Sequence, residues 1–111
     1  MDDKALSSAV RALNDAFRTS LHGGSVLLTA GVVALGSEAQ TRILAAVQAF
    51  DAFTDDNAPW GEHDFGSFEI DCERIFFKLD YYDLTRAMHA EDPADPSKTE
   101  RVMTIMLASE Y

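Results

Sequence analysis

The chain has 111 residues, of which 47% are hydrophobic and 25% charged, proportions that predict one globular domain over residues 1–111 rather than a disordered polypeptide. Its formal net charge of −10 repels phosphate groups, so we expect neither direct binding to nucleic acid nor attachment to an anionic membrane. With one cysteine, and with no apolar run near the ~20 residues that cross a bilayer, the chain is expected to be a soluble cytoplasmic protein.

A helix followed by a short buried strand is predicted at the start of the chain. Over residues 3–19 apolar residues recur three or four positions apart, as on one face of an amphipathic helix. This face consists of Leu6, Val10, Leu13 and Phe17. The polar residues expected on the solvated face are Arg11, Asn14, Asp15 and Arg18. The run at residues 25–30, rich in valine and leucine, predicts a buried strand.

A second helix is predicted over residues 37–53. Ser37 and Gln40 have the spacing of a capping box, in which each side chain bonds the backbone of the other residue. Ile43 and Val47 then fall on one face. The turn-forming residues 55–59 break this helix.

From residue 63 the apolar period changes to two, which predicts a β-hairpin. If Cys72-Glu73 is a two-residue turn, Ile70 faces Ile75 and Phe68 faces Phe77, so one face of the hairpin is apolar. A slip of one residue would turn the apolar side chains of one strand toward water, which favours this register. Cysteine is poorly suited to the positive φ of such a turn, so a longer or bulged turn is the alternative.

The C-terminal part of the chain predicts a loop and a third strand. Residues 83–97 contain two Asp-Pro pairs, which initiate turns. Residues 100–108 fit either a helix or a strand, and we favour the strand because an isolated hairpin needs a further partner. The predicted fold is α+β in the order α-β-α-β-β-β, with two helices packed on one face of a small, mainly antiparallel sheet.

Several segments of the chain carry a family resemblance. They are Leu13–Arg18, Leu28–Val32, Gly61–Gly66, Phe77–Asp83, Asp92–Pro96 and Thr104–Tyr111. Over nearly its full length the chain resembles a family of small uncharacterised bacterial proteins, a domain of unknown function often encoded on plasmids and other mobile elements. The resemblance implies a context of mobile DNA and no particular activity or catalytic residue.

The acidic middle of the chain is the main functional candidate. The segment from Asp51 to Asp95 contains thirteen acidic and three basic residues, so its formal charge of −10 equals the net charge of the whole chain. Solubility alone is the simpler interpretation. The functional interpretation is a non-enzymatic protein, monomer or homodimer, that docks on a basic protein partner. In its most specific form it is an inhibitor of the anti-restriction or anti-CRISPR type, whose carboxylates imitate nucleic-acid phosphates. The candidate partner-binding residues are Asp55, Asp56, Glu62, Asp64, Glu69, Asp71, Glu73, Asp83, Glu91 and Asp92.

Two alternatives remain open. In the predicted register His63 lies opposite Tyr82, and with Asp80 on the same face these residues, beside Asp64, could provide the general acid and base of a small hydrolase or isomerase. Ordinary hydrogen bonding is the favoured interpretation of this cluster. We therefore favour a protein without enzymatic activity and leave the enzymatic alternative open. The other alternative is a structural homo-oligomer without a catalytic role.

Neither a metal nor a cofactor is expected. His63, Asp64, Asp80 and His89 lack the short spacings of metal-binding motifs. The acidic residues 51–57 lack the glycine and glutamate of a calcium-binding EF-hand loop.

Overall fold

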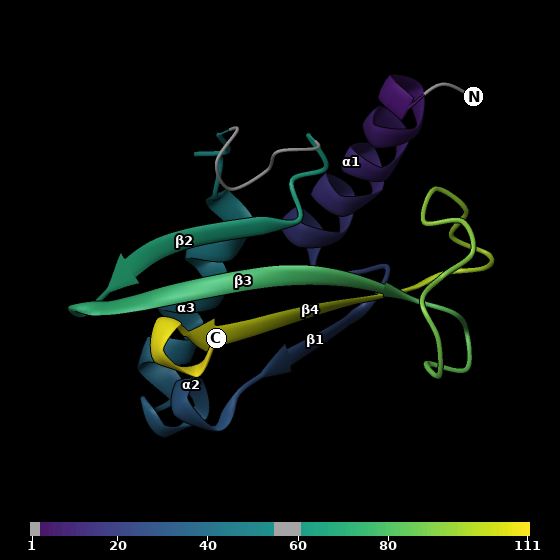
Figure 1. Cartoon of the computed structure of the whole chain (residues 1–111). Helices are drawn as coiled ribbons and strands as arrows, with labels where there is room; N and C mark the ends of the chain where they lie inside the picture. Colours follow the sequence, from purple (N-terminus) through teal and green to yellow (C-terminus); the bar gives the residue numbers. More distant parts are fainter. Residues whose placement is uncertain (1–2, 55–60) are drawn as a thin grey trace.

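The computed structural model describes residues 3–54 and 61–111. Its elements, in chain order, are α1 (Asp3–Ser20), β1 (Ser25–Leu28), α2 (Ala30–Ala34), α3 (Ser37–Ala49), β2 (Phe65–Ile70), β3 (Glu73–Tyr82), β4 (Glu100–Leu107) and the 3-10 helix η1 (Ala108–Glu110) (Figure 1). The predicted α+β class is confirmed, and α2 and η1 are short additions to the predicted order. The predicted helix break at residues 55–59 lies outside the described residues.

The strands form one mixed sheet in the order β1-β4-β3-β2. β3 pairs antiparallel with β2 and with β4, whereas β1 runs parallel to β4. The interpretation of residues 100–108 as a strand is confirmed, because β4 pairs with β3 from Glu100 to Leu107. This pairing supplies the third strand that the hairpin needs.

The register of the hairpin differs by two residues from the predicted one. The two-residue turn is Asp71-Cys72, not Cys72-Glu73, so Phe68 pairs with Ile75 instead of Phe77. Both turn residues have a positive φ, 52° and 68°, as a type I′ turn requires. Aspartate tolerates this left-handed conformation better than glutamate does, which favours the observed turn. A shift by two leaves every side chain on its predicted face, so the alternating pattern could not reveal it.

The sheet has one covered face. The side chains of Ile75, Phe77, Leu79 and Tyr81 are buried in a core shared with α1 and α3, and both helices lie on the same side of the sheet (Figure 1). The predicted packing of two helices on one face is therefore confirmed. The even-numbered residues of β3 and β4 and the odd-numbered residues of β1 and β2 point the other way. We call this second surface the open face; Val102 and Met106 of β4 are buried on it, whereas Leu27, Glu69 and Arg74 are exposed.

The ends of α3 differ from the prediction. Its N-cap residue is Gly36 and no side-chain hydrogen bond caps it, so the predicted capping box of Ser37 and Gln40 is wrong. Gln40 instead donates from its side chain to a backbone carbonyl of α2 at 3.0 Å. The helix ends before Phe50 rather than at residue 53. Phe50 has an extended backbone, and its ring packs edge-to-face on Phe77.

Candidate functional site

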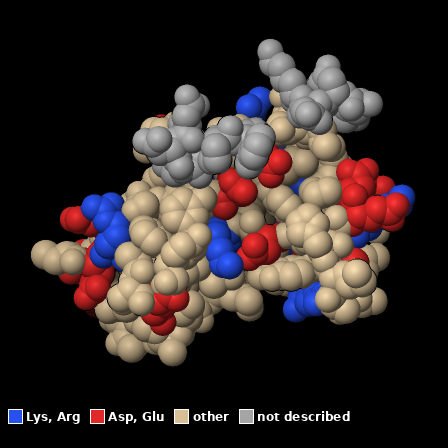
Figure 2. All heavy atoms as spheres, in the orientation of Figure 1, with Lys and Arg blue, Asp and Glu red and all other residues tan. Residues whose placement is uncertain are grey.

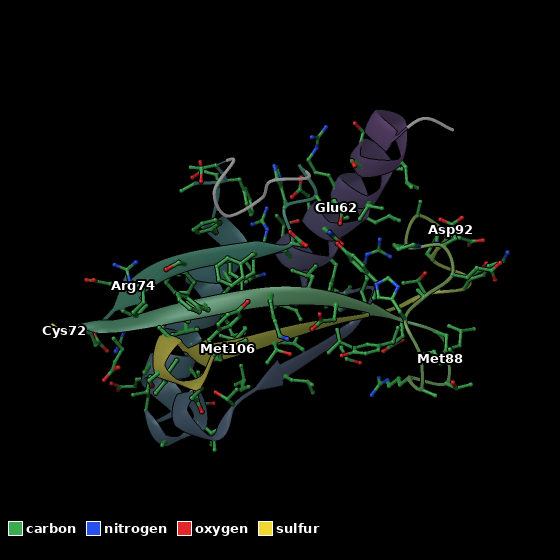
Figure 3. All side chains as sticks on the ribbon, in the orientation of Figure 1. Glu62, Cys72, Arg74, Met88, Asp92 and Met106 are labelled. Atoms are coloured by element: carbon green, nitrogen blue, oxygen red, sulfur yellow. The ribbon has the colours of Figure 1, made fainter. Side chains whose placement is uncertain are left out.

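The loop between β3 and β4, residues 83–99, lies at one end of the sheet, and we call it the end loop (Figure 1). Leu84 and Met88 in this loop are 65% and 71% exposed. Figure 3 shows Met88 and Asp92 at the opposite end of the molecule from Cys72 in the hairpin turn. Two large apolar side chains are therefore exposed on the same loop, as at many surfaces that contact another molecule.

Asp83 holds the first half of the end loop in one conformation. Its Oδ1 accepts hydrogen bonds from the backbone N–H of Thr85 at 3.1 Å, the hydroxyl of Thr85 at 2.7 Å and the backbone N–H of Ala87 at 3.2 Å. Its own backbone N–H donates to the carbonyl of Met88 at 2.8 Å. The backbone that carries Leu84 and Met88 is therefore ordered without a partner.

Arg86 ties the same loop to the sheet. Its backbone adopts the left-handed conformation, with φ 61°. Its Nη2 donates to Ser25 Oγ of β1 and to Glu100 Oε1 of β4, both at 2.7 Å. These bonds join the loop to two strands that are distant from it in sequence.

The second half of the end loop is built from two Asp-Pro turns, as the sequence predicts. Asp92 Oδ1 accepts the N–H of Ala94 at 3.1 Å, and Asp95 Oδ1 accepts the N–H of Ser97 at 2.9 Å. Thr99 Oγ1 then donates to the carbonyl of Asp92 at 2.7 Å. Both halves of the loop are thus fixed by side-chain bonds to the backbone.

A buried chain of hydrogen bonds lies beneath the end loop. Arg101 Nη2 donates to the carbonyl of Pro93 in the loop, and its Nε donates to Asn14 Oδ1 at 2.8 Å. Asn14 Nδ2 donates to Tyr81 Oη at 2.7 Å, and Tyr81 Oη donates to Glu62 Oε1 at 3.0 Å. We call Arg101, Asn14, Tyr81 and Glu62 the polar network. It connects a guanidinium to a carboxylate through two neutral groups and joins α1, the segment before β2, β3, β4 and the end loop.

The electrostatics of the polar network follow from its burial. Burial raises the pKa of Tyr81, so its hydroxyl keeps its proton and remains a donor to Glu62. Burial also lowers the pKa of Arg101, yet a guanidinium stays charged in proteins. The network therefore keeps one direction of hydrogen bonding and forms a rigid support for the loop.

Replacing Asp83 with alanine should loosen residues 84–88 while the sheet stays folded. The hydrogen bonds from Thr85 and Ala87 lower the pKa of Asp83 below its ordinary value. A carboxyl group with a lowered pKa stabilises the folded loop fully above about pH 3.9, the ordinary aspartate value, and this contribution is lost as the pH falls through the lowered pKa. We expect amide hydrogen exchange at Thr85 and Ala87 to accelerate several-fold in the variant and, in the native chain, only in acid. Asp95→Ala, which removes the equivalent carboxylate of the second turn, is the control and should leave Thr85 unchanged.

The predicted partner-binding residues do not gather on one surface. Those at residues 69–73 lie around the hairpin turn and those at residues 83–92 lie in the end loop. β3, whose 10 residues span about 33 Å, separates the two ends. Figure 2 shows the acidic atoms in separate groups. At the hairpin turn Asp71 pairs with Arg42, and Glu69 pairs with Arg74 at 2.8 Å, whereas Glu73 is exposed.

The remaining predicted carboxylates lie between these ends or outside the described residues. Glu62 belongs to the polar network. Partial burial raises the pKa of Asp64, and the nearby Asp80 raises it further. Asp55 and Asp56 lie outside the described residues.

The structure does not bring His63, Asp80 and Tyr82 together. The predicted pairing of His63 with Tyr82 is wrong, because the observed register pairs Phe65 with Lys78 and so differs by two residues. The ring of His63 stacks on Phe53 and its Nδ1 lies 2.9 Å from Asp15 Oδ1 of α1. Asp80 instead lies on the open face with Tyr82. The hydrolase or isomerase alternative stays a prediction. The carboxylate that His63 contacts in the structure is that of Asp15.

Residues 3–54 and 61–111 contain no group of three or more His, Cys, Asp or Glu side chains arranged to hold a metal ion. Within the same residues, no helix has both the length and the apolar composition needed to span a bilayer.

Comparison with known proteins identifies the family. The family described as "Protein of unknown function (DUF3768)" matches residues 28–110. The chain belongs to this family. Comparison with curated proteins and with solved structures gave no match. The family match contains the end loop and three members of the polar network, whereas Asn14 in α1 lies before it.

Sequence reasoning missed the residues that build and display the end loop. Asn14 was expected on the solvated face of the first helix, yet it is 0% exposed. Its spacing from Val10 and Phe17, four and three positions, places it on the apolar face and could have indicated burial. Arg101 lies two positions before Met103, so both side chains point to the covered face of β4. This spacing could likewise have indicated that Arg101 is buried. Leu84 and Met88 stand out in the sequence only as apolar residues within a polar loop, which is weak evidence for an exposed contact site.

Proposed function

We propose that this DUF3768 protein is a non-enzymatic protein-binding module whose end loop docks on a basic surface of a partner protein. One observation carries the proposal. Leu84 and Met88 are 65% and 71% exposed on a loop whose backbone is already fixed by Asp83 and Arg86.

An ordered loop with exposed apolar side chains is well suited to binding. Burying a leucine or methionine side chain contributes about 1.5–3 kcal/mol. Ordering a flexible loop during association would oppose this contribution, but the bonds of Asp83 and Arg86 order the end loop in advance. Methionine also adapts its shape to a partner surface. Leu84 and Met88 are therefore the proposed anchors of the contact.

The charge around these anchors favours a basic partner. The end loop holds four acidic residues, Asp83, Glu91, Asp92 and Asp95, and two basic ones, Arg86 and Lys98. Arg86 is engaged with Glu100 of β4, so the carboxylates dominate the field near Leu84 and Met88. Such a field accelerates association with a basic surface and makes binding weaken as salt is added.

The most specific form of this proposal is an inhibitor, carried on mobile DNA, that occupies the basic nucleic-acid channel of a defence enzyme. Full imitation of a phosphate backbone would call for a continuous row of carboxylates. The hairpin turn and the end loop divide the carboxylates between two ends of β3. The proposed contact therefore rests on the end loop alone.

The double substitution Leu84→Ser with Met88→Ser tests the proposal. We expect the immobilised native chain to capture a defined set of basic proteins from a host extract at about 50 mM salt and to release them at about 500 mM. The double variant should lose this set, and with a purified partner its Kd should rise about 30-fold or more, as expected for two anchor residues.

Val33→Ser is the matched control, because Val33 is 52% exposed on α2, outside the end loop. It should capture the same proteins as the native chain. Equal capture by the double variant, or capture that is indifferent to salt, would contradict the proposal.

A further inference from the structure

The open face differs from the rest of this acidic protein in its charge. The strands place five charged residues on it: Glu69, Arg74, Lys78, Asp80 and Glu100. Glu69 pairs with Arg74 at 2.8 Å, Asp80 with Lys78 at 3.3 Å, and Glu100 with Arg86 of the end loop at 2.7 Å. The ion pairs balance the charged strand residues of the open face, so the net charge of −10 is carried by other residues of the molecule.

The open face also presents aromatic and apolar side chains. The rings of Phe65, Phe76 and Tyr111 form an edge-to-face cluster with centroid distances of 5.1–5.9 Å. Tyr111 is 76% exposed, and Leu27 on β1 is 50% exposed. Figure 2 shows this face, where basic and acidic atoms lie next to one another over the strands. A neutral surface with exposed aromatic side chains has the composition of a protein interface.

We propose that the open face is the contact between two copies of this chain. Two molecules that each carry a charge of −10 repel one another, and the open face is the surface where that repulsion is locally cancelled. Burying it leaves no strand carboxylate or ammonium group without a partner, because each already has one. A basic partner would instead be drawn to the acidic ends of the sheet. In a two-fold dimer the open face of one copy contacts the open face of the other, so the ion pairs of one copy lie against the ion pairs of the other.

The size of the face sets the expected strength of the contact. β3 is 10 residues long, and four strands at ordinary spacing give the face an area on the order of 500 Å². A standard stable interface buries about 800 Å² on each partner. The dimer is therefore weak, with a Kd in the micromolar range or above.

Salt separates this contact from the one proposed for the end loop. Added salt screens the repulsion between two acidic copies, so dimerisation strengthens with ionic strength. Binding of a basic partner by the end loop weakens under the same change. The two proposals thus fail or succeed independently.

Sedimentation velocity over protein concentrations of roughly 1–500 µM, at about 50 and 500 mM salt, tests the inference. We expect the 12.2 kDa chain to shift toward a dimer as its concentration rises, and to do so more at high salt. A chain that stays monomeric over the whole range at both salts would overturn the proposal. A dimer that dissociates as salt is added would also overturn it.

Two variants locate the contact. Leu27→Glu adds an unpaired carboxylate to the open face and should weaken dimerisation about 10-fold or more. Tyr111→Ser removes an exposed aromatic ring without touching the core and should weaken it in the same direction. Dimerisation of both variants at the native strength would show that the contact lies elsewhere and would overturn the proposal.

Two controls match these variants. Val33→Glu adds the same charge at a similarly exposed position, 52%, on α2, and should dimerise like the native chain. The Leu84→Ser and Met88→Ser double variant should also dimerise normally, because it alters only the end loop.

Discussion

Replacing Asn14 with alanine should lower the free energy of unfolding by about 3 kcal/mol, because it removes a fully buried hydrogen-bonding group from the centre of the polar network. In a chain of this length such a loss lowers the unfolding midpoint by roughly 15 °C. Chemical denaturation followed by circular dichroism measures the change.

The expected effect is large because Asn14 connects Arg101 and Tyr81, which are only 2% and 8% exposed. Its amide oxygen accepts from Arg101 at 2.8 Å, and its amide nitrogen donates to Tyr81 Oη at 2.7 Å and to the carbonyl of Glu62 at 2.9 Å. Alanine would leave a buried guanidinium N–H without its acceptor, and unsatisfied charged groups are costly. The loss should also reach the end loop, because Arg101 bonds the carbonyl of Pro93.

Two further variants separate the network from an ordinary helix effect. Thr19→Ala changes an exposed residue of α1 whose hydroxyl bonds backbone carbonyls of the same helix, and it should change stability by less than about 0.5 kcal/mol. Tyr81→Phe combined with Asn14→Ala should cost clearly less than the sum of the two single changes, because both remove the same hydrogen bond. An Asn14→Ala chain as stable as the native one would show that the network does not support the fold.

Gly66→Ala should destabilise the protein by about 3 kcal/mol although it adds a single methyl group. A Cβ atom at Gly66 would lie 2.5 Å from Cζ of Phe77 and 2.8 Å from Cε1 of Phe50, distances that real side chains do not tolerate. The ring of Phe77 cannot withdraw, since it is fully buried and packs edge-to-face on Phe50 and Phe53. Thermal unfolding monitored by circular dichroism would show the loss.

A compensating change tests the cause. Phe77→Leu in the Gly66→Ala chain makes room for the added methyl group, so the double variant should be no less stable than Gly66→Ala alone, even though Phe77→Leu destabilises the native chain. Ser67→Ala is the neighbouring control on the open face and should have little effect. If the two changes simply add, the predicted clash is not the reason.

Local periodicity was enough to predict most elements of the fold. The spacing of Val10 and Phe17 predicts α1, and that of Ile43 and Val47 predicts α3, because one turn of a helix depends only on residues three or four positions apart. Alternation likewise predicts β2 and β3. α2 escaped this reasoning because five residues are too few to show a period. The start of α2 is bonded to η1, because Glu110 of η1 accepts hydrogen bonds from Thr29 and Gly31.

The hairpin register and the grouping of charges needed tertiary information. A shift of two residues preserves the face of every side chain, so only the turn distinguishes the two registers, and Asp71 with Cys72 adopts the left-handed conformations of the observed one. The acidic residues are close in sequence, but β3 carries them to opposite ends of the sheet. The neutrality of the open face arises in the same way, since Arg86 meets Glu100 only after the end loop folds back on the strands.

The amino-acid sequence alone determined the fold class, the positions of the main helices and strands and the negative charge, because these depend on composition and on near neighbours. The tertiary structure decided which residues act together. Asn14 and Arg101 are 87 positions apart, and nothing in a local pattern indicates that they share a hydrogen bond. The conformation of the end loop, the exposure of Leu84 and Met88 and the pairing of charges on the open face depend on such distant contacts, whose geometry exists only when the sheet and helices are packed.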